Sequence, residues 1–232
     1  MNRNCVVGRQ QGGNAVDSEA VFKIIDVAKQ VEDKTGNFQQ LMQGRVPELH
    51  LTIGLHDDQP VLSLVKFAIE YIEMAPRVLE CVEVCAKEAH SEELFAPFLA
   101  TALNYFIHPA IAFTRFQGLD GLLMKAYLCH RLLEEMYENN KSIRNSQLCT
   151  VEITQANLLA HQLIGEPFAN ELDESVDLTL QQLAGTPDYY ELNLMPFVEQ
   201  AQHQAWGWMR EYWQNLLIRN HIQFHFSYRR VY

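Results

Sequence analysis

The residue best suited to chemistry in this sequence is His130, which has Glu134 one helical turn after it. Apolar residues recur at helical spacing between 119 and 139, and His130 falls on the same face as Leu123 and Ala126. A buried imidazole beside a carboxylate can bind a metal ion or act as a general base. It can equally donate a hydrogen bond to Glu134 or to a backbone carbonyl and simply pack in the core. The sequence leaves both roles open.

A transition-metal site between helices would draw on a small set of imidazoles and carboxylates, namely His90, His130, Glu134, His161 and Glu166. The Glu-x-x-His pattern of dinuclear metal sites in helical bundles does not occur in the sequence. Neither do the common phosphate-binding loops, the zinc-protease motif or zinc-finger cysteine pairs. We therefore predict no cofactor, and keep a transition metal at these residues as the alternative.

The segment from 196 to 219 carries all three tryptophans and two apolar stripes at helical spacing. A helix that is apolar over so wide an arc must be covered on two sides. It is either the central helix of a bundle, or one side meets a second subunit. We expect a homodimer or larger assembly, whose interface residues are Trp206, Met209, Trp213 and Leu217.

The net charge of −11 argues against nucleic acid as the main partner, because binding phosphates requires a surplus of Lys and Arg. No Lys or Arg occurs between Arg144 and Arg210, so one stretch is purely acidic. No apolar run approaches the length of a membrane span, so we expect no membrane association. The five cysteines lack Cys-x-x-Cys spacing, which indicates reduced thiols and a cytoplasmic location.

Apolar periodicity, together with Gly and Pro at the ends of the periodic segments, predicts a series of helices. Pro76 is expected to end the second of them. Two segments near 48–55 and 221–230 instead alternate with a period of two, which predicts a pair of short strands. The predicted helices cover residues 18–35, 60–75, 77–89, 91–106, 119–139, 153–164, 168–184 and 196–219.

These features predict a mainly α fold, a single-domain bundle of about seven or eight helices with a short two-stranded β element. We expect a flexible N-terminal segment over 1–16 and one helical domain over 17–232. The function we predict is a non-catalytic protein-interaction or regulatory module that self-associates and binds a protein partner. The alternative is a metal- or cofactor-dependent enzyme whose site lies between helices around His130, Glu134 and His161.

Overall fold

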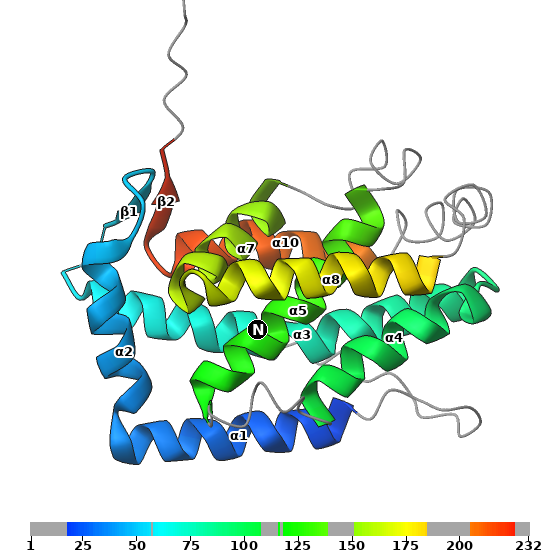
Figure 1. Ribbon diagram of the computed structural model, residues 1–232, viewed down its shortest axis with the longest axis horizontal. Coiled ribbons are helices and arrows are strands. Elements are labelled where there is room, and N and C mark those ends of the chain that lie inside the picture. Colours follow the sequence, from blue (N-terminus) through cyan, green and yellow to red (C-terminus); the bar gives the residue numbers. More distant parts are fainter. Residues whose placement is uncertain are drawn as a thin grey trace, which may run out of the picture.

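Eight α-helices and a two-stranded ribbon make up the described part of this computed structural model, residues 18–56, 58–107, 116, 118–138, 151–184 and 205–225 (Figure 1). The prediction of a mainly helical domain with a two-stranded β element is confirmed. The helices are α1 Ser18–Thr35, α2 Asn37–Arg45, α3 Pro60–Glu88, α4 Glu92–Ile107, α5 Leu119–Glu138, α7 Val151–Ile164, α8 Phe168–Ala184 and α10 Ala205–Arg219.

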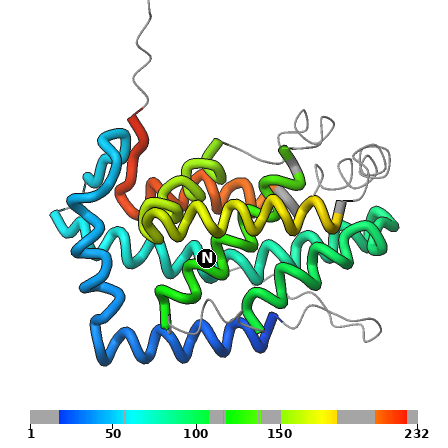
Figure 2. The backbone as a smooth tube through the Cα atoms, in the orientation of Figure 1, coloured from blue at the N-terminus to red at the C-terminus, as the bar shows by residue number. Residues whose placement is uncertain are grey.

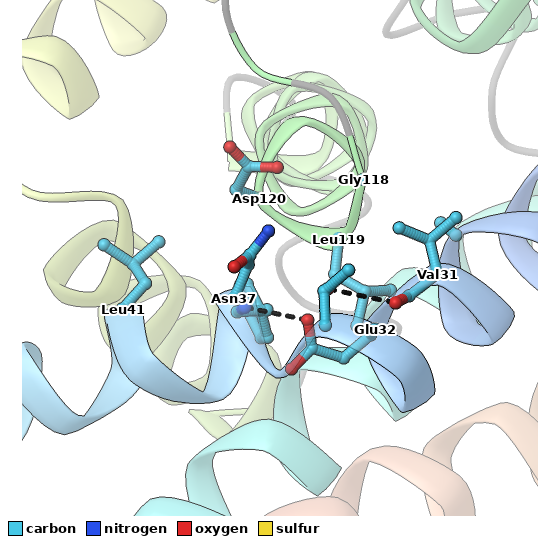
Figure 3. A pocket seen from close by; sticks show the side chains of 10 residues that line it. Val31, Glu32, Asn37, Leu41, Gly118, Leu119 and Asp120 are labelled. Atoms are coloured by element: carbon cyan, nitrogen blue, oxygen red, sulfur yellow. Dashed lines mark hydrogen bonds between the residues drawn. The ribbon is translucent and has the colours of Figure 1, made fainter.

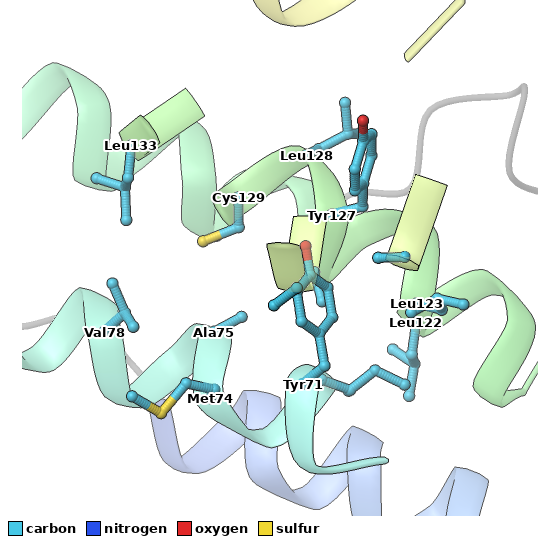
Figure 4. Packing of buried hydrophobic residues seen from close by; sticks show 14 of the residues in the cluster. Tyr71, Met74, Ala75, Val78, Leu122, Leu123, Tyr127, Leu128, Cys129 and Leu133 are labelled. Carbon is cyan, nitrogen blue, oxygen red and sulfur yellow. The ribbon is translucent and has the colours of Figure 1, made fainter. Parts of the chain in front are cut away.

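Helix α5 lies at the centre of the bundle and packs against α1, α3, α4, α7 and α8. Its side chains are buried around nearly the whole circumference, as expected for a helix covered on all sides. Figure 4 shows Leu122 and Leu133 of α5 in the layer that this helix shares with Tyr71 and Val78 of α3. The polar residues of α5 are therefore held inside the molecule together with its apolar ones.

The prediction that Pro76 ends a helix is wrong, because α3 continues through it from Pro60 to Glu88. Proline removes one backbone donor and its ring crowds the carbonyl four residues earlier, which usually kinks or ends a helix. Here Pro76 is itself buried, and Ala75 and Val78 beside it also lie in the core. Burial of this apolar run outweighs the loss of one hydrogen bond.

Helix α10 packs against both α3 and α7, which accounts for its broad apolar arc. Met209, Trp213 and Leu217 are buried within this one chain, so the fold already covers three of the four residues expected at a subunit interface. The side chain of Trp206, the fourth, lies outside the described residues, as do residues 196–204 of the predicted helix. Trp208 is 43% exposed on the outer side of α10.

Helix α1 has the limits that the sequence predicts, whereas α2 was not predicted as a helix. Gly36 adopts φ 63°, a left-handed conformation that glycine accepts readily, and it separates the two helices. The Glu32 side chain then accepts hydrogen bonds from the backbone N–H of Phe38 at 2.7 Å and of Gln39 at 2.9 Å. These two bonds cap the start of α2, a role that is invisible in the apolar pattern.

The strands β1 Ile53–Leu55 and β2 Ile222–Phe224 pair antiparallel, with Ile53 opposite Phe224 and Leu55 opposite Ile222. Figure 2 shows the C-terminal strand lying beside a strand from the first quarter of the chain. Ile222 is 1% exposed and joins the main core. A two-stranded ribbon is marginal by itself, so this contact anchors it to the helices.

The described helices all fall short of the combined length and apolarity that crossing a bilayer requires. Three of the cysteines, Cys81, Cys85 and Cys129, are described. All three are buried, and none of them forms a disulfide. Buried thiols of this kind behave as small apolar side chains.

Replacing Ile222 by Ala should lower the free energy of unfolding by about 2 to 4 kcal/mol, because the substitution leaves a cavity where the ribbon meets the core. The neighbouring Gln223 is exposed, so Gln223→Ala should change stability by less than about 0.5 kcal/mol. Urea denaturation of both variants measures the difference. Equal effects would show that the ribbon does not depend on this anchor.

Candidate functional site

A buried carboxylate, that of Glu134, is the centre of a polar cluster inside the helical bundle. Its side chain is 1% exposed and forms an ion pair with Arg131, in which Nη1 lies 2.6 Å from Oε2. Its other oxygen, Oε1, accepts a hydrogen bond from the Thr154 hydroxyl at 2.6 Å. A buried charge is tolerated only when paired and hydrogen-bonded in this way.

Asn157 of α7 connects this carboxylate to helix α3. It is 3% exposed, and its Nδ2 donates to Oε2 of Glu134 at 2.5 Å. Its Oδ1 accepts a hydrogen bond from the Tyr71 hydroxyl at 2.7 Å. Burial, followed by the nearby charge of Tyr127, raises the pKa of Tyr71 well above its usual value, so this hydroxyl keeps its proton. One polar path therefore runs from α5 through α7 to α3.

Arg131 links the same cluster to helix α8. Besides Glu134, its guanidinium contacts the carboxylate of Glu135, and its Nε lies 3.3 Å from Oδ1 of Asp173. Burial lowers the pKa of Arg131, but the charge of Glu134 and their hydrogen bond outweigh this effect and raise it above the ordinary value. The guanidinium is thus a permanent positive charge facing three carboxylates.

His130 is 3% exposed, as its place on the apolar stripe predicts, but its hydrogen-bond partner is not Glu134. Its Nε2 donates to the backbone oxygen of Tyr71 at 3.1 Å, and its ring packs against Tyr71 and Trp213 at centroid distances of 4.5 and 5.0 Å. Burial lowers the pKa of His130 to about 4, so the imidazole is neutral at pH 7. This is the structural arrangement that the sequence left open.

His161 of α7 lies beside α8 and contacts groups different from those around His130. Its Nε2 donates to Oδ1 of Asn170 at 3.0 Å and lies 3.5 Å from Oδ2 of Asp173. The Tyr127 hydroxyl also donates to Asp173, at 2.7 Å, and the rings of Tyr127 and His161 are 6.1 Å apart. His161 thus joins the cluster through Asp173 and Arg131.

The remaining predicted metal ligands lie elsewhere. His90 is exposed in the turn between α3 and α4, and Glu166 is exposed in the turn between α7 and α8. Within the described residues, no group of three or more His, Cys, Asp or Glu side chains is arranged to hold a metal ion. Of the five predicted ligands, Glu134 and His161 are linked only indirectly, because Arg131 pairs both with Glu134 and with Asp173, which His161 contacts. His90 and Glu166 lie outside this cluster.

Several residues of the cluster were not predicted from the sequence, among them Arg131, Asn157, Asp173 and Tyr71. The position of Arg131, three and four residues before Glu134 and Glu135, is a recognisable spacing for helical ion pairs. Asn157 could have been noticed as a polar residue among Ala156, Leu159 and Ala160. Asp173 and Tyr71 offer no local signal, because their partners come from other helices.

The cluster is well suited to holding α3, α5, α7 and α8 together, since its donors and acceptors satisfy one another across these four helices. Comparison with family models, with curated proteins and with solved structures gives no match.

Replacing Glu134 by Ala should lower the free energy of unfolding by about 3 kcal/mol, because Asn157 and Arg131 lose the buried charge that they bind. As a control, Glu19→Ala removes a carboxylate that is 62% exposed and pairs with Lys23 on the surface. The control should cost less than about 1 kcal/mol. Chemical denaturation measures both values, and a loss for Glu134→Ala no larger than the control would contradict the role of this carboxylate.

The buried imidazole should make stability depend on pH. Because the pKa of His130 falls from 6.5 to about 4 on folding, the unfolded chain binds a proton that the folded protein excludes between these values. The protein should therefore lose about 2 kcal/mol of stability through His130 between pH 7.5 and pH 5.

Comparison with His130→Gln, which cannot titrate in this range, isolates this contribution from that of the carboxylates. Urea denaturation of both proteins at the two pH values should show the wild type losing about 2 kcal/mol more than the variant. Parallel losses would mean that His130 does not exclude its proton in the folded state.

Proposed function

We propose that this protein is a non-catalytic protein-interaction module that self-associates through the outer face of α1. The supporting observation is a row of exposed apolar side chains: Ile24, Val27 and Val31 are 39%, 60% and 47% exposed. Their spacing of three and four residues places them on one side of the helix. Such a stripe is typical of a helix that packs against a partner. We call it the α1 stripe.

A hollow lies along one edge of the α1 stripe, between α1, α2 and the start of α5. Its volume is about 440 Å³, and Val31, Leu41 and Leu119 are among the residues that line it (Figure 3). Leu41 of α2 is 41% exposed beside it. A hollow lined in part by apolar side chains offers a place for the side chains of a partner helix, as knobs fit into holes.

Charges on the two edges of the α1 stripe favour a second copy of this chain as the partner. Lys34 and Lys23, the latter paired with Glu19, lie along one edge, and Glu32 and Asp120 line the hollow at the other. Burial raises the pKa of Asp120, and the charge of Glu32 adds to this effect. A two-fold axis along α1 would place the lysine edge of one copy against the carboxylate edge of the other.

The polar cluster around Glu134 supports a non-catalytic role. A catalytic acid or base needs an atom free to meet a substrate, whereas Glu134, Arg131 and Asn157 are each engaged by partners inside the fold. The cysteines Cys81, Cys85 and Cys129, which form no disulfide, are in keeping with the cytoplasm as the location that goes with this proposal.

Static light scattering after gel filtration, at high micromolar concentration, should give twice the chain mass of 26.8 kDa for the wild type. Val27→Glu places a charge at the centre of the α1 stripe and should shift the protein to the monomer mass, with the melting temperature of the monomer unchanged. A wild type that stays monomeric under these conditions contradicts the proposal.

The matched control is Leu178→Glu on α8. Leu178 is 59% exposed, close to the 60% of Val27, so the two substitutions are equal in exposure and in chemistry. The control should remain a dimer. If both variants dissociate equally, then added negative charge rather than the α1 stripe governs the assembly.

A further inference from the structure

Histidines gather at the β-ribbon. The chain has nine histidines, and four of them, His50, His56, His221 and His225, fall in the two short segments that form this ribbon. Backbone hydrogen bonds continue the pairing past both ends of the strands: His56 N–H donates to the oxygen of His221 at 2.9 Å, and His225 N–H donates to that of Thr52 at 2.7 Å. The fold therefore brings together residues about 170 positions apart.

Two of these imidazoles converge over a glycine. The ring centroids of His56 and His225 are 5.7 Å apart, with the ring planes at 83°. A Cβ atom at Gly54 would lie 2.7 Å from Nε2 of His225 and 3.1 Å from Nε2 of His56. Both Nε2 atoms therefore point at the space that a side chain of residue 54 would fill. Gly54 leaves this space open between the two strands.

Two neutral imidazoles facing one space are a recognised donor set for zinc, copper and nickel ions. Metal–nitrogen bonds of about 2.0 to 2.1 Å require the Nε2 atoms to approach each other closely. Both side chains are exposed, so small rotations about their side-chain bonds can bring this about without disturbing the core.

We propose that His56 and His225 bind one divalent transition-metal ion through their Nε2 atoms, with water at the remaining coordination positions. Because no group of three potential ligands exists among the described residues, the site is an open one with two protein ligands. Copper(II) is the ion expected to bind most tightly, in keeping with the general order of affinities for nitrogen ligands. The ion links the N-terminal strand to the C-terminal one.

Titration of the full chain with copper(II) alone, followed by calorimetry, tests this site. His56→Gln and His225→Gln should each raise the dissociation constant at least about tenfold, since each leaves a single imidazole. His90→Gln is the control, because His90 is equally exposed but lies in the turn between α3 and α4. It should bind copper(II) as the wild type does.

Electron paramagnetic resonance of the copper(II) complex counts the bound nitrogens directly. The wild-type spectrum should show two imidazole nitrogens at this site, and each single variant should show one. The proposal is overturned if the double variant His56→Gln/His225→Gln keeps the wild-type affinity and nitrogen count. It is overturned equally if His90→Gln weakens binding as much as the ribbon variants do.

Discussion

The burial of one carboxylate, that of Glu134, constrains the arrangement of the helices around it. Moving a charged group out of water costs several kcal/mol unless its oxygens are fully paired. The partners come from three places: Arg131 from the same helix, and Thr154 and Asn157 from α7, with Tyr71 of α3 bound to Asn157. A shift of α7 by one residue would turn Asn157 by about 100° and move it by about 1.5 Å, and both bonds would be lost. Apolar packing tolerates several registers, whereas this pairing allows one. We infer that the cluster selects this one register of α7 against the others.

Arg131 connects this buried cluster to the acidic segment that contains α7 and α8. The sequence has no Lys or Arg between Arg144 and Arg210, so the carboxylates of α7 and α8 have no basic partner within their own segment. Asp173 of α8 instead contacts the guanidinium of Arg131, on the central helix. A pairing between different helices also occurs after this segment. Arg219 of α10 pairs with Glu70 of α3 at 2.7 Å and stacks over Tyr212.

The sequence was sufficient for most helix limits and for the strand pair, because these depend on local signals. Gly36 marks the end of α1, and the period-two alternation around Ile53 and Phe224 reflects their pairing across the ribbon. Pro76 misled the prediction because its cost is compensated by tertiary burial, which no local rule contains. For His130 the sequence left open a hydrogen bond to Glu134 or to a backbone carbonyl. The structure shows the carbonyl, that of Tyr71, so His130 and Glu134 do not pair. Their spacing places both on one side of α5, but the partner of each is decided by the neighbouring helix: Tyr71 of α3 for His130, and Asn157 of α7 for Glu134. A one-turn spacing shows that two residues can meet, and the surrounding helices decide whether they do.

The same reasoning indicates which side chains of this molecule can bind a ligand at low energetic cost. Polar atoms that already hold hydrogen bonds in a dry core must break them before they can bind a ligand, which is costly. The exposed imidazoles of His56 and His225 carry no such cost, since water is the group that a ligand would replace. Their ribbon is marginal as a sheet and is tied to the core through Ile222. A ligand that bridges the two strands therefore stabilises the paired form by mass action, and through Ile222 this stabilisation reaches the helices.

The α1 stripe differs from this histidine pair, because it belongs to a long helix already packed against α3 and α5. Binding there adds a partner without changing the fold that presents it.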